Sequence, residues 1–283
     1  MTFSGIRSAV RQATLAVSFA VAIPAPAHAQ GKLDARYDFT LAGIPVGRGS
    51  WVIDVGDDHF NSSASGQTAG LMRVLAGGRG QSVARGTIVD GQVFPGTFRS
   101  SIFTDRKYND VRMTIGGGAV REFAAEPKMP PAPNRVPLTE AHRRGVIDPM
   151  SASLFYVPGT GTLITRDACA RKLAIFDGRM RYDLHLTFKR IEQVKAEKGY
   201  HGKAVVCSVI FSPIAGHVPD RAPIQYLANL REIEATLAPI AGTRVLAPYR
   251  VAVPTPIGTG LMQATQFVST PQPGKPSTSA KAQ

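Results

Sequence analysis

Hydrophobic and polar residues alternate along most of the chain, with the period of two that is typical of half-buried β-strands. The segment ARYDFTLAG places Ala35, Tyr37, Phe39 and Leu41 on one face. The segments GRGSWVIDVGDD and HFNSSASGQT then continue this pattern. The alternation predicts a meander of antiparallel strands at the start of the mature chain.

Glycine-centred turns separate the later strands. Asp-Gly pairs, which are the strongest short signal for a β-hairpin, occur at Asp90-Gly91 and Asp177-Gly178. After the second of these turns, alternation continues through RYDLHLTF. Many short strands without a βαβ pattern predict a mainly β fold: a curved antiparallel sheet, or open β-barrel.

Only two short segments have a helical pattern, and we expect both to cover the concave face of the sheet. They are TAGLMRVLAGG (68–78) and DPMSASLFYVPG (148–159), the second with Asp148 as a candidate N-cap before a proline. A curved sheet with two covering helices creates an apolar pocket. An alternative is that the helices plug the barrel as ordinary core. The residues expected to line or gate the pocket are Leu71, Met72, Leu75, Leu154 and Phe155.

The N-terminus has the features of a secretory signal peptide. Arg7 and Arg11 precede a short apolar run, and Ala27-His28-Ala29 has the small residues that signal peptidase selects. We therefore expect cleavage after Ala29 and export to a bacterial periplasm. No later apolar run is long enough to span a membrane.

We expect one β-rich domain over residues 30–268, followed by a disordered tail at 269–283 that lacks core residues. The Pro-rich stretch 124–148 is interpreted as a long crossing loop, with a domain linker as the alternative.

The chain has two cysteines, Cys169 and Cys207. Cysteines in an oxidising compartment usually pair, so we predict a disulfide that joins neighbouring β elements. The alternative is a reactive or metal-binding pair. The sequence has no CxxC, and only His201 is near Cys207, whereas zinc needs about four such ligands.

The formal net charge is +13, and the basic residues are scattered rather than clustered. In an exported protein this charge favours anionic partners such as phospholipid headgroups at a membrane surface, lipopolysaccharide or acidic polymers. The alternative is that the charge serves solubility alone. Because no nucleic-acid-binding motif is present, we expect no nucleic-acid partner. The sequence does not determine the oligomeric state.

No catalytic motif is evident: the chain lacks G-x-S-x-G, H-E-x-x-H and a phosphate-binding glycine loop. His185 alternates with Leu184 and Leu186, which places it on the polar side of its strand. Asp148 is interpreted as a cap and Asp177 as a turn residue. We therefore expect no enzyme activity, no metal and no cofactor.

Four segments together resemble an exported bacterial family, the domain of unknown function 3108. They are ARYDFTLAGIPVGRGSW, ASGQTAGLMRVLAGGRGQSVARGTIVDGQVFPGTF, DPMSASLFY and IFDGRMRYDLHLTF. The resemblance implies a fold similar to the periplasmic lipoprotein carriers, an open barrel with helices over an apolar cavity, and it implies no catalytic residues. Our first hypothesis is binding of a lipid or another apolar envelope molecule. The alternatives are an envelope-integrity scaffold acting through protein contacts, and an enzyme acting on envelope polymers.

Overall fold

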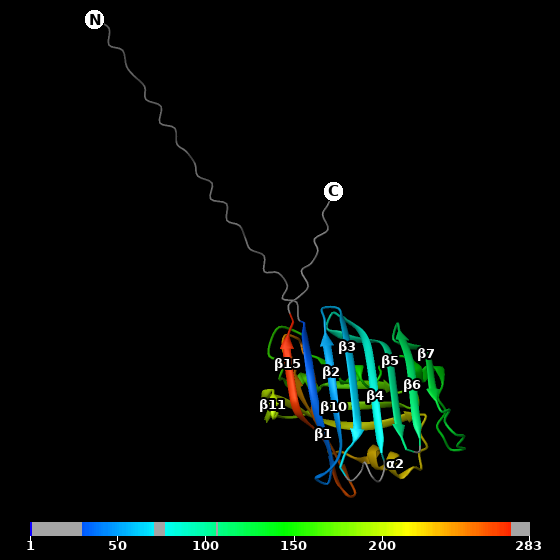
Figure 1. The fold of residues 1–283 in the computed structure, drawn as a ribbon. Helices are drawn as coiled ribbons and strands as arrows, with labels where there is room; N and C mark the ends of the chain where they lie inside the picture. The colour runs from blue at the N-terminus through cyan, green and yellow to red at the C-terminus, as the bar shows by residue number, and fades with distance from the viewer. Residues whose placement is uncertain (2–29, 71–76, 106, 273–283) are drawn as a thin grey trace.

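The computed structural model describes residues 1, 30–70, 77–105 and 107–272, and it is mainly β (Figure 1). The first seven strands are β1 (Gly31–Leu41), β2 (Ile44–Val55), β3 (His59–Thr68), β4 (Gly78–Val89), β5 (Gln92–Thr104), β6 (Tyr108–Gly116) and β7 (Ala119–Glu126). The later strands are β8 (Phe155–Tyr156), β9 (Arg171–Phe176), β10 (Arg181–Lys195), β11 (Lys198–Gly199), β12 (His201–Ala215), β13 (Ile233–Pro239), β14 (Val245–Thr255) and β15 (Gly258–Pro271). β15 therefore extends to Pro271, past residue 269, where the sequence predicted the tail to begin.

The longer strands form one sheet in the order β7-β6-β5-β4-β3-β2-β1-β15-β14-β13-β12-β10-β9, with every neighbouring pair in this order antiparallel. The two-residue strands lie off this order: β8 pairs with β14, and β11 pairs in parallel with β15. β1 and β15 come from opposite ends of the chain and lie side by side near the middle of the sheet. The sheet curves strongly, so that the strands from β9 to β13 cross the strands from β2 to β6 (Figure 1). The predicted curved antiparallel sheet is confirmed.

The sheet does not close into a barrel by direct pairing of its edge strands, β7 and β9. A short extended segment hydrogen-bonds to both edges instead. The amide of Gly145 donates to the carbonyl of Gly118 beside β7, at 2.6 Å. The amide of Ile147 donates to Ala174 of β9 at 2.9 Å, and Phe176 donates back to Ile147 at 3.1 Å. This segment thus spans the gap and satisfies edge groups that would otherwise be unpaired.

Two core clusters fill the curved sheet. The first contains alternating inward residues of the N-terminal strands, such as Leu33, Ile53 and Phe60. It also contains Met150 and Leu154, which lie in the segment just before β8. The second lies against β12, β13 and β14 and includes Phe155 and the cysteine pair. Through these two clusters the described residues bury a large hydrophobic core with few helices.

The helices differ from the prediction. Residues 148–159 form the short 3-10 turn η2 (Ser151–Ser153) followed by β8, and they do not form an α-helix. Strand β8 pairs with β14, and the Ser153 hydroxyl bonds back to the carbonyl of Pro149 at 2.9 Å. Both interactions compete with continuation of a helix.

Other short elements are η1 (Glu140–Arg143), η3 (Arg166–Cys169) and α2 (Ala222–Asn229). The helix α2 was not predicted, because its eight residues are fewer than the roughly 11 to 18 residues over which a helical period is recognised. The other predicted helix, 68–78, lies largely outside the described residues, as do Leu71, Met72 and Leu75.

Candidate functional site

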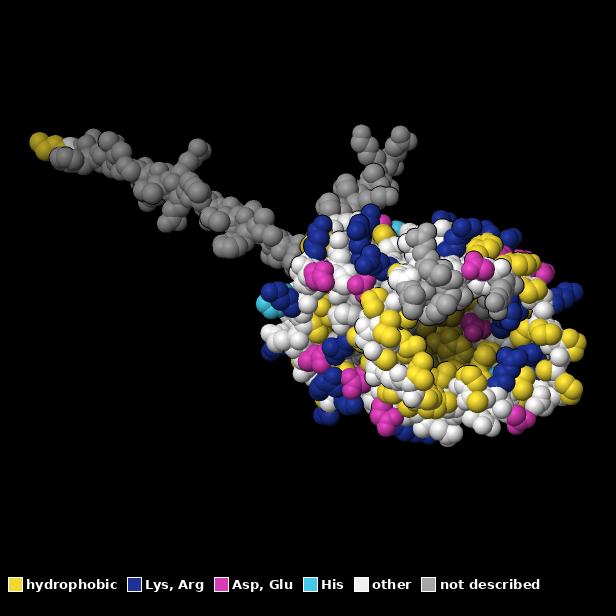
Figure 2. Space-filling model, turned by 60° about the horizontal axis from the view of Figure 1, so that its bottom comes forward, with side chains coloured by type: hydrophobic (Ala, Val, Ile, Leu, Met, Phe, Trp, Pro, Cys, Tyr) yellow, Lys and Arg dark blue, Asp and Glu magenta, His cyan; other side chains and the backbone are white. Residues whose placement is uncertain are grey.

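An apolar recess opens on the inner face of strands β2 to β5, at the end of the molecule that carries α2; we call it the inner recess. It has a volume of about 480 Å³. Figure 2 shows this end of the molecule hollowed and lined with hydrophobic side chains. The apolar side chains that line it are Phe39, Val46, Ala64 and Ile102.

Glycines make this part of the wall hollow. Gly49, Gly66 and Gly80 lie directly opposite one another on β2, β3 and β4. They share the inward face with Ala64, because residues two apart in a strand point to the same side. Gly66 and Gly80 line the inner recess, and their missing side chains leave space there. Beside Gly49 the ring of Phe39 occupies the corresponding space.

A smaller recess of about 290 Å³ continues the inner recess toward the core. The two share Ser82 and Ile102 in their linings. The smaller recess is lined further by Trp51, Phe98 and Met150. Trp51 is the chain's only tryptophan, so the site carries its own fluorescent reporter.

Polar groups within these walls already have partners. The Trp51 indole Nε1 donates to the Ser62 hydroxyl at 2.7 Å, and the Ser82 hydroxyl donates to that of Ser100 at 2.9 Å. Because these groups are satisfied, they present little unmet polarity to a ligand.

The smaller recess has a polar rim. Arg179 donates to the side chain of Asn109 at 2.6 Å, and burial raises the pKa of the adjacent Asp177 carboxyl. The arrangement is therefore an apolar space with one charged end, the usual layout for a ligand with an apolar body and a polar head.

Of the five residues predicted to line the pocket, the structure describes Leu154 and Phe155, and it places both in the hydrophobic core. Leu154 and Phe155 are both buried, but they point into the first and second core clusters respectively, and neither lines a recess described above. Neighbours in an extended segment point to opposite sides, which explains the separation. Sequence reasoning missed the glycine row, although the glycines fall at alternate positions of predicted strands.

Asp148 has the predicted capping role, on the 3-10 turn η2. Its Oδ1 accepts from the amides of Met150 at 3.0 Å and Ser151 at 2.9 Å. The side chain is fully buried, and burial raises the pKa of its carboxyl. It fixes the segment that carries Met150 into the smaller recess.

The predicted disulfide is present. Cys169 at the end of η3 and Cys207 in β12 have Cα atoms 5.4 Å apart, and both residues are fully buried. The bond fastens the segment before β9 to the middle of the C-terminal strands.

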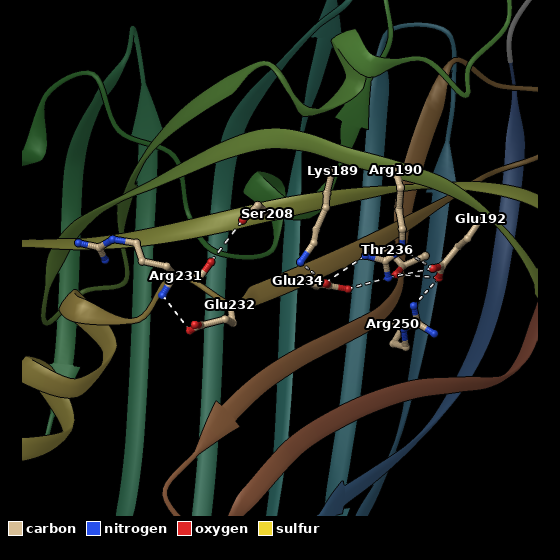
Figure 3. Close-up of polar contacts among 9 residues, drawn as sticks. All are labelled: Lys189, Arg190, Glu192, Ser208, Arg231, Glu232, Glu234, Thr236 and Arg250. Carbon is tan, nitrogen blue, oxygen red and sulfur yellow. Dashed lines mark hydrogen bonds and ion pairs between the residues drawn. The ribbon is translucent and has the colours of Figure 1, made fainter.

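A charged cluster joins strands β10, β13 and β14 (Figure 3). Arg190 binds Glu234 in bidentate fashion, at 3.1 and 2.8 Å, and Lys189 lies 2.6 Å from the same carboxylate. Arg250 and Arg190 both bind Glu192. Because both carboxylates are paired with arginine, we interpret the cluster as a clamp between strands and not as a source of acid or base.

The charged cluster predicts a measurable pH dependence. The hydrogen bonds that Arg190 donates to Glu234 lower the pKa of the Glu234 carboxyl to about 2. The pair should therefore stabilise the fold above the unfolded-state pKa near 4.5, and this contribution should vanish as the pH falls toward 2. We expect Arg190→Gln to raise the pKa of Glu234 in an NMR carboxyl titration and to cost about 1 kcal/mol at pH 7, since solvent screens the pair.

The matched control is Arg85→Gln, which removes a guanidinium from the exposed face of β4. It should leave the titration of Glu234 unchanged. An unshifted Glu234 pKa in Arg190→Gln would contradict the assignment of the clamp.

No helix within the described ranges is long and apolar enough to cross a bilayer. In the same ranges, no three His, Cys, Asp or Glu side chains come together as a metal site would require.

Comparison with known proteins gives a family and a likeness to solved structures. The family model described as "Protein of unknown function (DUF3108)" matches residues 36–265. A crystal structure described as a beta-barrel-like protein of domain of unknown function DUF1849, from Brucella abortus, is similar at a TM-score of 0.49 and 9% identity. The likeness covers 85% of this chain and 98% of that chain. None of the curated proteins compared matches the chain.

Proposed function

The chain belongs to the DUF3108 family, and we propose that it is an exported, periplasmic protein that binds a lipid or another apolar cell-envelope molecule in its inner recess. It holds this ligand without converting it. The proposal follows from the shape and chemistry of the site.

The observation that carries the proposal is the apolar recess behind the glycine row. Its volume of about 480 Å³ falls within the range of roughly 300 to 1,000 Å³ that is usual for small-molecule sites. The recess is open to solvent, so its hydrophobic lining is left in contact with water, and an apolar occupant would gain free energy by covering it. The adjoining smaller recess extends the space for a chain-like ligand.

Two further features support the location. The N-terminal 29 residues have the composition of a signal peptide. The Cys169–Cys207 disulfide is the kind of bond that persists in oxidising compartments such as the periplasm.

The test uses Trp51 as an energy donor. A polyene fatty acid that absorbs at the tryptophan emission wavelength should quench Trp51 saturably, because its chain would lie beside the indole. Trp51→Phe should abolish the transfer while leaving binding, followed by the fluorescence of the fatty acid itself, within about threefold. Absence of saturable binding by either signal would overturn the proposal.

A further inference from the structure

A second recess lies on the opposite, outer face of strands β1 to β5; we call it the outer recess. Its volume is about 710 Å³. Arg36, which lines it, alternates along β1 with the buried Ala35 and Tyr37, so it points away from the inner recess. The lining includes three arginines, Arg36, Arg48 and Arg79.

A row of polar side chains crosses the floor of the outer recess. The strand register places these residues opposite one another on five successive strands: Arg36, Ser50, Ser65, Gln81 and Ser101. The hydroxyls of Ser50 and Ser65 lie 2.9 Å apart, which confirms that they share a face. With neighbouring strands about 4.8 Å apart, the row is about 19 Å long. It offers hydroxyl and amide groups along an extended ligand.

A second row runs beside the first and supplies charge and an aromatic ring. It contains Arg48, Gln67, Arg79 and Phe103, again opposite one another in the register. Arg48 and Arg79 are two strands apart, so their backbones are separated by about 10 Å. The Arg79 guanidinium lies 5.6 Å from the centre of the Phe103 ring, which holds that side chain at the recess.

Most of the positive charge in the outer recess is not neutralised. Arg48 lies 3.4 Å from Asp38 across an exposed pair, which solvent screens. Within the described residues, neither Arg36 nor Arg79 makes an ion pair. The carboxylate of Asp110, at the far end of the first row, is bound by Ser101 and lies beside Arg99 and Arg112.

We propose that the outer recess binds an acidic oligosaccharide, at a second site on the opposite face of the strands that form the inner recess. Guanidinium groups bind carboxylates through paired hydrogen bonds, and their spacing suits a ligand with several anionic groups along a chain. The serine and glutamine side chains match sugar hydroxyls, and the exposed Phe103 ring can pack against a sugar face. A flat membrane surface fits less well, because its headgroups would have to enter a recess.

The test measures binding of an oligogalacturonate hexamer by calorimetry, with a neutral glucose hexamer of the same length for comparison. We expect the acidic hexamer to bind and the neutral one to bind at least tenfold more weakly. Arg36→Gln with Arg79→Gln should weaken binding of the acidic hexamer at least tenfold, and added salt should weaken it further.

The matched control is Arg85→Gln with Arg121→Gln, which makes the same change in net charge outside the outer recess. It should change the affinity less than threefold. An equal loss in both double variants would overturn the proposal in favour of non-specific attraction to a basic surface. Absence of hexamer binding, alongside Arg36- and Arg79-dependent binding to anionic phospholipid vesicles, would overturn it in favour of a membrane surface. Neither outcome bears on fatty-acid binding at Trp51.

Discussion

Removal of the Cys169–Cys207 disulfide is expected to lower the free energy of unfolding by about 4 kcal/mol. The bond closes a loop of 38 residues, and the loss of loop entropy in the unfolded chain predicts a stabilisation of this order. Both sulfur atoms belong to buried residues of the second core cluster, so the bond also fixes η3 against β12. Chemical denaturation of wild type and of Cys169→Ala with Cys207→Ala, followed by circular dichroism, measures the difference.

Two controls separate the cross-link from the lost side-chain volume. Wild-type protein refolded in reductant keeps both sulfur atoms and should lose most of the same stability. Each single alanine variant already breaks the bond, so the double variant should cost little more than either single variant. A reduced wild type as stable as the oxidised protein would contradict this prediction.

Filling the inner recess should abolish ligand binding while the fold is kept. Gly66 and Gly80 suit this test, because a Cβ at either position would meet its nearest neighbour at 3.5 Å, an ordinary contact distance. Gly49 does not, since its Cβ would lie 2.9 Å from the Ser65 carbonyl oxygen. Leucine at positions 66 and 80 should project into the inner recess from two opposed strand positions.

We expect Gly66→Leu with Gly80→Leu to weaken fatty-acid binding at least tenfold, a loss of about 1.4 kcal/mol or more. The fatty-acid titration measures the affinity, and the circular dichroism spectrum and melting temperature report the fold. Gly161→Leu is the control: nothing lies within 4 Å of its Cβ, and it does not line the inner recess. Unchanged affinity in a well-folded double variant would show that the ligand binds elsewhere.

The sequence predicts the fold through periodicity. Alternation around Tyr37 and the Asp90-Gly91 turn requires strands, and the structure has them there. The gap between β7 and β9 could not be predicted, because the segment that spans it bonds to two strands distant in sequence. The segment around Ser151 could not be predicted for the same reason. Its apolar spacing is compatible with a helix, but the residues that follow form β8 because they pair with β14, which is distant in sequence.

The candidate site is less evident in the sequence. Trp51 has the alternation of an inward residue, but the pattern cannot distinguish core from the lining of a space. The inner recess depends on the register that aligns Gly66 with Gly80, and register is a long-range property. The cysteine pairing was predictable, because a chain with two cysteines allows one intramolecular bond.

The most direct test of the central claim, that the inner recess holds an apolar ligand, is native mass spectrometry. Residues 30–283 would be purified from a periplasm without detergent, as wild type and as Gly66→Leu with Gly80→Leu. We predict a discrete added mass on the wild type, released on denaturation as a lipid or similar apolar molecule, and absent from the double variant. A bare polypeptide in both, from protein that is folded and disulfide-bonded, would contradict the account and favour a protein that acts through contacts with other proteins.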